Sequence, residues 1–83
     1  MDENDRLIQT AALGLAYHQM QGRIVTGYEL SYEMAPSFDQ DANEIHVFLA
    51  DNWLKVRYLC SHIIFWTKQN IPQDEVVQSP LTE

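Results

Sequence analysis

The sequence predicts a small, mainly α-helical domain of about three helices. Apolar residues recur at three- and four-residue steps over residues 5–21 and again over residues 45–66, which is the period of an amphipathic helix. Apolar residues also make up 46% of the 83 residues, which is typical of a globular chain and too many for a disordered one. We therefore expect one globular domain over residues 1–70 and a flexible C-terminal tail over residues 71–83, where prolines interrupt a polar sequence.

The first helix is predicted over residues 5–21. Acidic residues before it suit the positive end of the helix dipole, and Gly22 is a suitable stop. The buried face comprises Ile8, Ala12 and Leu15, and we expect a second apolar line of Leu13, Tyr17 and Met20 to widen it.

Residues 24–34 support two interpretations. Tyr28, Leu30 and Tyr32 alternate with polar residues, which is the period of a half-buried strand. Thr26 followed by Glu29 is instead a capping box, which would begin a short helix ending before Pro36. We favour the helix, because a lone strand needs a pairing partner and no other segment alternates as clearly.

Residues 36–43 are predicted to form a loop. Asp41 and Glu44 then form a second capping box, which opens the apolar run of residues 45–66. Fifteen of these 22 residues are apolar, with Val56 at the centre of the apolar stripe and Lys55 on the polar side.

The weak point of this run is Asp51-Asn52, because both residue types favour helix caps over helix interiors. An unbroken helix over residues 41–69 would span about 43 Å, which is long for so small a domain, so we expect a break there. The alternative fold is α+β, in the order α-β-β-α, with strands at 24–34 and 44–50 and a helix from Trp53.

Charge is distributed unevenly along the chain. The formal net charge is −7, and residues 22–52 hold six carboxylates against one arginine. Residues 53–70 hold three Lys or Arg and no carboxylate. A negative field of this kind repels nucleic acid and attracts basic partners, although net charge of this size also serves solubility.

The segment Val25-Thr26-Gly27-Tyr28-Glu29-Leu30, placed between a helix at 5–21 and another from Asp41, resembles the three-helix core of helix-turn-helix and winged-helix domains. The resemblance covers roughly residues 6–58 and implies a DNA-binding regulator. The would-be recognition helix departs from that pattern, because it has no Lys or Arg before Lys55 and carries carboxylates that would repel phosphates.

No constellation of residues indicates an enzyme, a metal site or a cofactor. Cys60 and His62 are the only close nucleophile and base, and two positions apart on a helix they point to different sides. One cysteine allows no internal disulfide, and the acidic N-terminus lacks the features of a signal peptide, so we expect a cytoplasmic protein. Charges inside residues 45–66 argue against a membrane span.

The aromatic residues lead to the functional hypothesis, because Trp and Tyr are enriched at protein interfaces. We expect a small acidic interaction module, an inhibitor, adaptor or antiactivator of a larger machine, with nucleic-acid-associated machines among the candidates. It would form a homodimer and bind a protein with a basic surface, without binding nucleic acid directly or associating with a membrane. The alternative is a DNA-binding regulator of helix-turn-helix type. The expected partner-binding residues are Tyr28, Glu29, Tyr32, Glu33, Asp39, Asp41, Trp53 and Tyr58.

Overall fold

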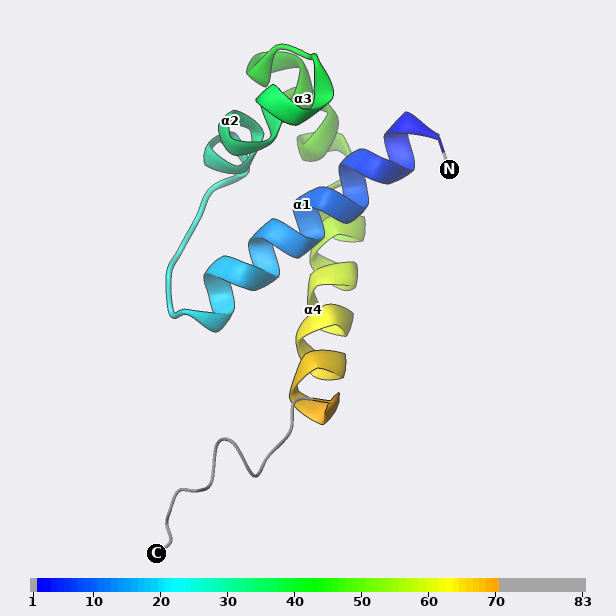
Figure 1. Ribbon diagram of the computed structural model, residues 1–83. Helices are drawn as coiled ribbons and strands as arrows, with labels where there is room; N and C mark the ends of the chain where they lie inside the picture. Colours follow the sequence, from blue (N-terminus) through cyan, green and yellow to red (C-terminus); the bar gives the residue numbers. More distant parts are fainter. Residues whose placement is uncertain (1, 71–83) are drawn as a thin grey trace, which may run out of the picture.

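The computed structural model describes residues 2–70, and nearly all of them are helical (Figure 1). The helices are α1 (Glu3–Met20), α2 (Gly27–Phe38), α3 (Ala42–Asp51) and α4 (Trp53–Asn70). The prediction of a mainly α domain is confirmed. The α-β-β-α alternative is wrong, because no strand occurs within residues 2–70. The predicted tail over residues 71–83 lies outside the described residues.

Both ends of α1 are fixed by local hydrogen bonds. The Asp2 carboxylate accepts a bond from the Asp5 backbone N–H at 2.8 Å, which caps the first turn. At the other end Gly22 adopts a positive φ of 76°, and the N–H of Arg23 donates to the carbonyl of His18 at 2.9 Å. This is a Schellman ending, so the predicted stop at Gly22 is confirmed.

The capping box at the start of α2 is confirmed. Glu29 N–H donates to the Thr26 hydroxyl at 3.1 Å, and Thr26 N–H donates to the Glu29 carboxylate at 2.9 Å. The predicted end before Pro36 is wrong, because α2 continues to Phe38. Proline costs one hydrogen bond in this last turn, whereas the extension buries the Phe38 ring, which is worth about 1.5–3 kcal/mol.

The predicted loop over residues 36–43 is correspondingly shorter, and only Asp39, Gln40 and Asp41 separate α2 from α3. Asp39 ends α2 with a left-handed backbone, at φ 52° and ψ 38°. Asp41 occupies the N-cap position of α3, but its carboxylate accepts no hydrogen bond from the helix. The predicted Asp41–Glu44 capping box is therefore wrong as a hydrogen-bonded unit.

The predicted break at Asp51-Asn52 is confirmed, and it divides the long apolar run into two helices, giving four over residues 2–70 instead of about three. The amide side chain of Asn52 donates to the carbonyl of Phe48 at 2.9 Å, which ends α3. The carbonyl of Asn52 accepts from the N–H of Val56 at 3.1 Å, which begins α4. Asn52 is thus the only residue between the two helices.

The helices pack as two pairs, α1 against α4 and α2 against α3, and the second pair lies at one end of the molecule (Figure 1). Gly14 of α1 sits close to α2, since a Cβ added there would lie 3.0 Å from the Leu30 side chain. The core draws on all four helices. It contains Leu7, Ile8, Ala11, Ala12, Leu15, Ala16, Leu30, Met34, Phe38, Ile45, Leu49, Val56 and Cys60.

The predicted widening of the α1 face is wrong. Leu13, Tyr17 and Met20 are 57%, 60% and 43% exposed, whereas Ala11, Ala12 and other residues of the same helix are buried. The helix is packed closely on one side only, because α2 covers less of it than α4 does. These three side chains instead edge an open apolar groove between α1 and α2.

Candidate functional site

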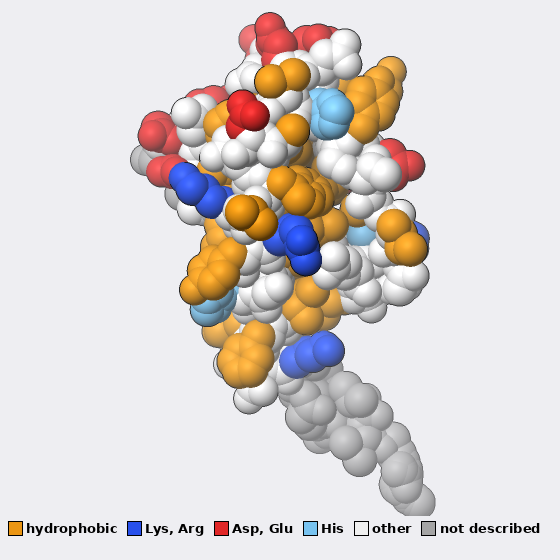
Figure 2. Space-filling model, turned by 180° about the vertical axis from the view of Figure 1, so that it is seen from behind, with side chains coloured by type: hydrophobic (Ala, Val, Ile, Leu, Met, Phe, Trp, Pro, Cys, Tyr) orange, Lys and Arg blue, Asp and Glu red, His pale blue; other side chains and the backbone are white. Residues whose placement is uncertain are grey.

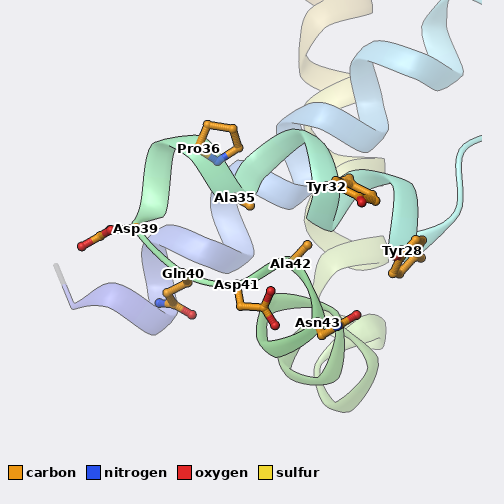
Figure 3. Close-up of a pocket in the computed structure, with 9 residues that line it drawn as sticks. All are labelled: Tyr28, Tyr32, Ala35, Pro36, Asp39, Gln40, Asp41, Ala42 and Asn43. Carbon is orange, nitrogen blue, oxygen red and sulfur yellow. The ribbon is translucent and has the colours of Figure 1, made fainter.

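A hollow open to solvent lies where α2 turns into α3. Tyr28, Tyr32 and Pro36 recur every four residues along α2, so they share one face of the helix and form one side of the hollow. The three-residue turn and the first residues of α3 form the other side (Figure 3). Its volume is about 640 Å³, enough for one or two large side chains of a partner. Its lining residues are Tyr28, Tyr32, Ala35, Pro36, Asp39, Gln40, Asp41, Ala42 and Asn43.

Three aromatic rings form a row beside the hollow. The rings of Tyr28 and Tyr32 meet edge to face at 5.4 Å between centroids, and Tyr28 meets His46 of α3 in the same way at 5.5 Å. Such contacts stabilise each pair by about 0.5–1.5 kcal/mol and fix the ring orientations. Tyr32 nevertheless remains 64% exposed and Tyr28 42% exposed, so both present side-chain surface to solvent.

The hollow also contains hydrogen-bond acceptors. The carboxylates of Asp39 and Asp41 come from the turn, and Asp39 projects outward from it (Figure 3). Pro36 has no N–H, so the carbonyl of Tyr32 loses the donor that residue 36 of a helix ordinarily supplies. Asp39 also has a structural role, because aspartate tolerates the left-handed backbone better than most residues.

The surroundings of the hollow are strongly acidic. Residues 27–52 hold six carboxylates and no Lys or Arg. Acidic side chains gather over the α2–α3 end of the molecule, whereas the surface further along α4 carries hydrophobic and basic side chains (Figure 2). Two arginines lie close by: Arg6 bonds Glu3 at 3.0 Å and stacks on Phe38, and Arg23 stacks on Tyr17 and lines a neighbouring depression with Tyr28 and Tyr32. The residues that line the hollow itself combine aromatic faces with two carboxylates and include no Lys or Arg.

The structure brings together four of the eight residues expected at a partner site: Tyr28, Tyr32, Asp39 and Asp41 all line the hollow. Glu29 and Glu33 lie on the neighbouring side of α2, in a smaller depression that Tyr28 and Tyr32 also edge. Each has a local partner there. Glu29 belongs to the capping box, and Glu33 reaches His18 of α1 at 3.2 Å.

The other two expected residues lie outside the hollow. Trp53 is half-buried at the start of α4, where its ring is 3.6 Å from a Cβ added at Gly27, so it supports the first turn of α2. Tyr58 lies on α4 and does not line the hollow, and its hydroxyl bonds His62 at 3.1 Å. Sequence reasoning placed these two on a later helix than Tyr28 and Tyr32, but grouped all four at one site by residue type.

Sequence reasoning also missed Pro36, Gln40, Asn43 and His46. The signal for Pro36 was present, because it continues the four-residue spacing of Tyr28 and Tyr32, but proline was read as a helix stop. His46 and Asn43 carry no signal without the packing of α3 against α2.

Cys60 and His62 do not form a nucleophile–base pair, because each contacts another residue. Cys60 is buried, and burial raises the pKa of its thiol, so the nucleophilic thiolate is disfavoured. Its sulfur lies 3.7 Å from the amide oxygen of Gln19, and His62 bonds Tyr58 instead. Within residues 2–70, no three His, Cys, Asp or Glu side chains cluster in a way that could hold a metal ion. None of the four described helices is both long and apolar enough to cross a bilayer.

Comparison with known proteins gave no match to a family model, a curated protein or a solved structure.

Proposed function

We propose that this protein is an acidic interaction module that binds a basic segment of a partner protein in the hollow between α2 and α3. It would act as an adaptor or inhibitor of that partner. The observation that carries the proposal is the placement of two exposed tyrosine rings in one hollow with the Asp41 carboxylate, in a stretch of 26 residues without a single Lys or Arg.

The chemistry of the hollow suits an arginine side chain best. A guanidinium can stack on the exposed Tyr32 ring, which is worth about 0.5–1 kcal/mol at an exposed site. Its N–H groups can donate to the Asp41 carboxylate and to the Tyr32 carbonyl, and a hydrogen bond involving a charged group contributes about 1.5–3 kcal/mol. The surrounding carboxylates would also accelerate the encounter with a basic partner.

The binding test uses a fluorescent Gly-Arg repeat peptide, followed by anisotropy at low and physiological salt. We expect Tyr32→Ala and Asp41→Asn each to weaken binding about 5- to 30-fold, in line with the loss of roughly 1–2 kcal/mol. The matched controls are Tyr58→Ala, an equally exposed tyrosine outside the hollow, and Glu44→Gln, which removes the same charge nearby.

A Gly-Gln repeat peptide should not bind. Equal losses of peptide affinity in Glu44→Gln and Asp41→Asn would contradict the proposal, since they would show that net charge alone attracts the peptide. An undiminished affinity in Tyr32→Ala would likewise exclude the aromatic face from the site.

One observation favours the alternative of a DNA-binding regulator. The connection of α2 to α3 is only three residues long, as in helix-turn-helix units, and α3 would then be the recognition helix. Its charges oppose that role, because residues 42–51 include Glu44 and Asp51 but no Lys or Arg.

We expect the protein alone not to bind random-sequence duplex DNA at about 0.15 M salt. The three cations of α4 are few against the six to ten phosphate contacts typical of salt-sensitive DNA binders. Fluorescence anisotropy of a labelled duplex checks this. Tight binding that Arg57→Ala abolishes would reverse the ranking of the two functions.

Self-association as a twofold dimer is part of the same proposal. It is supported by the large apolar side chains that α4 leaves exposed, and twofold pairs are the commonest oligomers. Sedimentation equilibrium at micromolar concentration tests it.

A further inference from the structure

Helix α4 is apolar on two opposite faces. Val56 and Cys60 are buried against α1, at 0% and 2% exposure. At about 100° per residue, Leu54, Tyr58 and Phe65 lie on the reverse side of the helix, within about 40° of one another. They are 81%, 67% and 64% exposed. We refer to these three residues as the outer α4 stripe.

The outer stripe is not the face from which self-association was predicted. That prediction rested on the apolar excess of residues 45–66, and the structure buries much of it in the core, including Ile45, Leu49 and Val56. What remains exposed is a separate set of side chains on the far side of α4. A soluble helix with apolar residues on both sides is normally covered on both sides.

We propose that the outer α4 stripe is the interface between two copies of this chain, which pair through antiparallel α4 helices about a twofold axis level with residue 60, beside Ser61. The inference rests on the self-association in the proposed function and specifies its surface and orientation. In this register Leu54 faces Phe65 of the partner subunit, and Tyr58 faces His62 of the partner subunit. Ser61 is small and exposed, so it allows close approach at the axis.

Charge decides the orientation. The α2–α3 end, with its six carboxylates, lies at the start of α4, and α4 itself carries only Lys and Arg among its charged residues. A parallel pair would bring two acidic ends together. An antiparallel pair places the acidic end of each copy beside the C-terminal part of the other α4, where Lys68 lies. Opposed helix dipoles favour the same arrangement.

The stripe supplies a substantial part of the area that a dimer needs. Tyr58 and Phe65 are each about two-thirds exposed, and a large aromatic side chain can bury 150–250 Å². Together they offer roughly 250 Å², and Leu54, which is 81% exposed, adds to this. A standard interface takes about 800 Å² from each partner, which the polar residues flanking the stripe would complete.

The first test is mass by sedimentation equilibrium between about 1 and 100 μM. Wild type should approach twice 9.7 kDa, whereas Leu54→Glu and Phe65→Glu should stay at 9.7 kDa, because each places carboxylates at the interface. Val47→Glu is the control, since Val47 is 63% exposed on α3 and should leave the dimer intact. Circular dichroism melts of all three variants show whether the fold is kept.

The second test determines whether the two α4 helices run parallel or antiparallel, with a short bismaleimide cross-linker. It uses a Cys60→Ser background, so that only introduced cysteines react. In the antiparallel register the two copies of residue 54 lie about 18 Å apart along the helix axes, whereas residue 54 of one copy adjoins residue 65 of the other. Leu54→Cys mixed with Phe65→Cys should therefore cross-link, and either variant alone should not. Cross-linking of each variant to itself would indicate a parallel pair and overturn the proposal.

A wild-type mass of 9.7 kDa throughout, or a dimer unaffected by both glutamate variants, would also overturn it. The peptide assay separates the two proposals, because the monomeric Phe65→Glu variant retains the α2–α3 hollow. If that variant binds the peptide with unchanged affinity, peptide binding in the hollow does not depend on dimerisation.

Discussion

Replacing Val56 with aspartate is expected to unfold the protein. Val56 is 0% exposed and lies where α4 packs against α1. A carboxylate buried there without a partner costs at least about 4 kcal/mol, a large part of the roughly 5–15 kcal/mol that stabilises a typical domain. Circular dichroism should show loss of the cooperative thermal transition, or a melting temperature lowered by tens of degrees.

Lys55→Ala is the matched control for this change. Lys55 is the preceding residue, is exposed, and should alter the free energy of unfolding by no more than about 0.5 kcal/mol. A Val56→Asp variant that melts like wild type would mean that α4 presents a different face to α1.

Ile45→Ala is expected to lower the free energy of unfolding by about 2–5 kcal/mol. Ile45 is fully buried on α3, and its truncation removes apolar contacts and leaves a cavity among rigid neighbours. For a domain of this size, that corresponds to a fall in melting temperature of at least about 8 °C. Urea titration followed by circular dichroism measures the free energy directly.

Val47→Ala provides the comparison, because Val47 is also β-branched, lies two residues away on the same helix and is 63% exposed. Its loss should cost less than about 1 kcal/mol. Similar losses at both positions would contradict the helical packing of α3, because a strand would place residues 45, 47 and 49 on one face.

This contrast shows why the fold class was predictable from sequence. The apolar pattern of residues 44–50 fits both the alternation of a strand and the spacing of a helix. Ile45 and Leu49 are buried and Val47 is exposed, which is the helical pattern. Signals confined to a few neighbouring residues were reliable: Thr26 with Glu29 began a helix, Gly22 ended one, and Asn52 divided another. Their hydrogen bonds need no distant partner.

Features that depend on distant packing were not predictable in the same way. Leu13 is as apolar as Leu15, yet only Leu15 is buried, because the difference lies in how much of α1 the other helices cover. Asp41 had the sequence of a capping box, but its side chain lines the hollow instead. Pro36 was read as a stop, and the burial of Phe38 carried the helix past it.

For the candidate site too, local spacing was informative and distant packing was not. Tyr28 and Tyr32 are one helical turn apart, and the nearby turn supplies Asp39 and Asp41, so local spacing alone was enough to group them. Trp53 and Tyr58 were grouped with them only by residue type. Their separation depends on the direction in which α4 leaves Asn52.

Only Asn52 separates α3 from α4. The direction in which each side chain of α4 points is therefore tied to the orientation of α3. Each residue added to or removed from a helix turns everything beyond it by about 100°. An insertion at Asn52 would rotate Val56 out of the core and bring the exposed Lys55 toward it. The length of this joint is therefore more tightly constrained than the identity of its side chain, and natural variation of the chain should appear there as substitution instead of insertion or deletion.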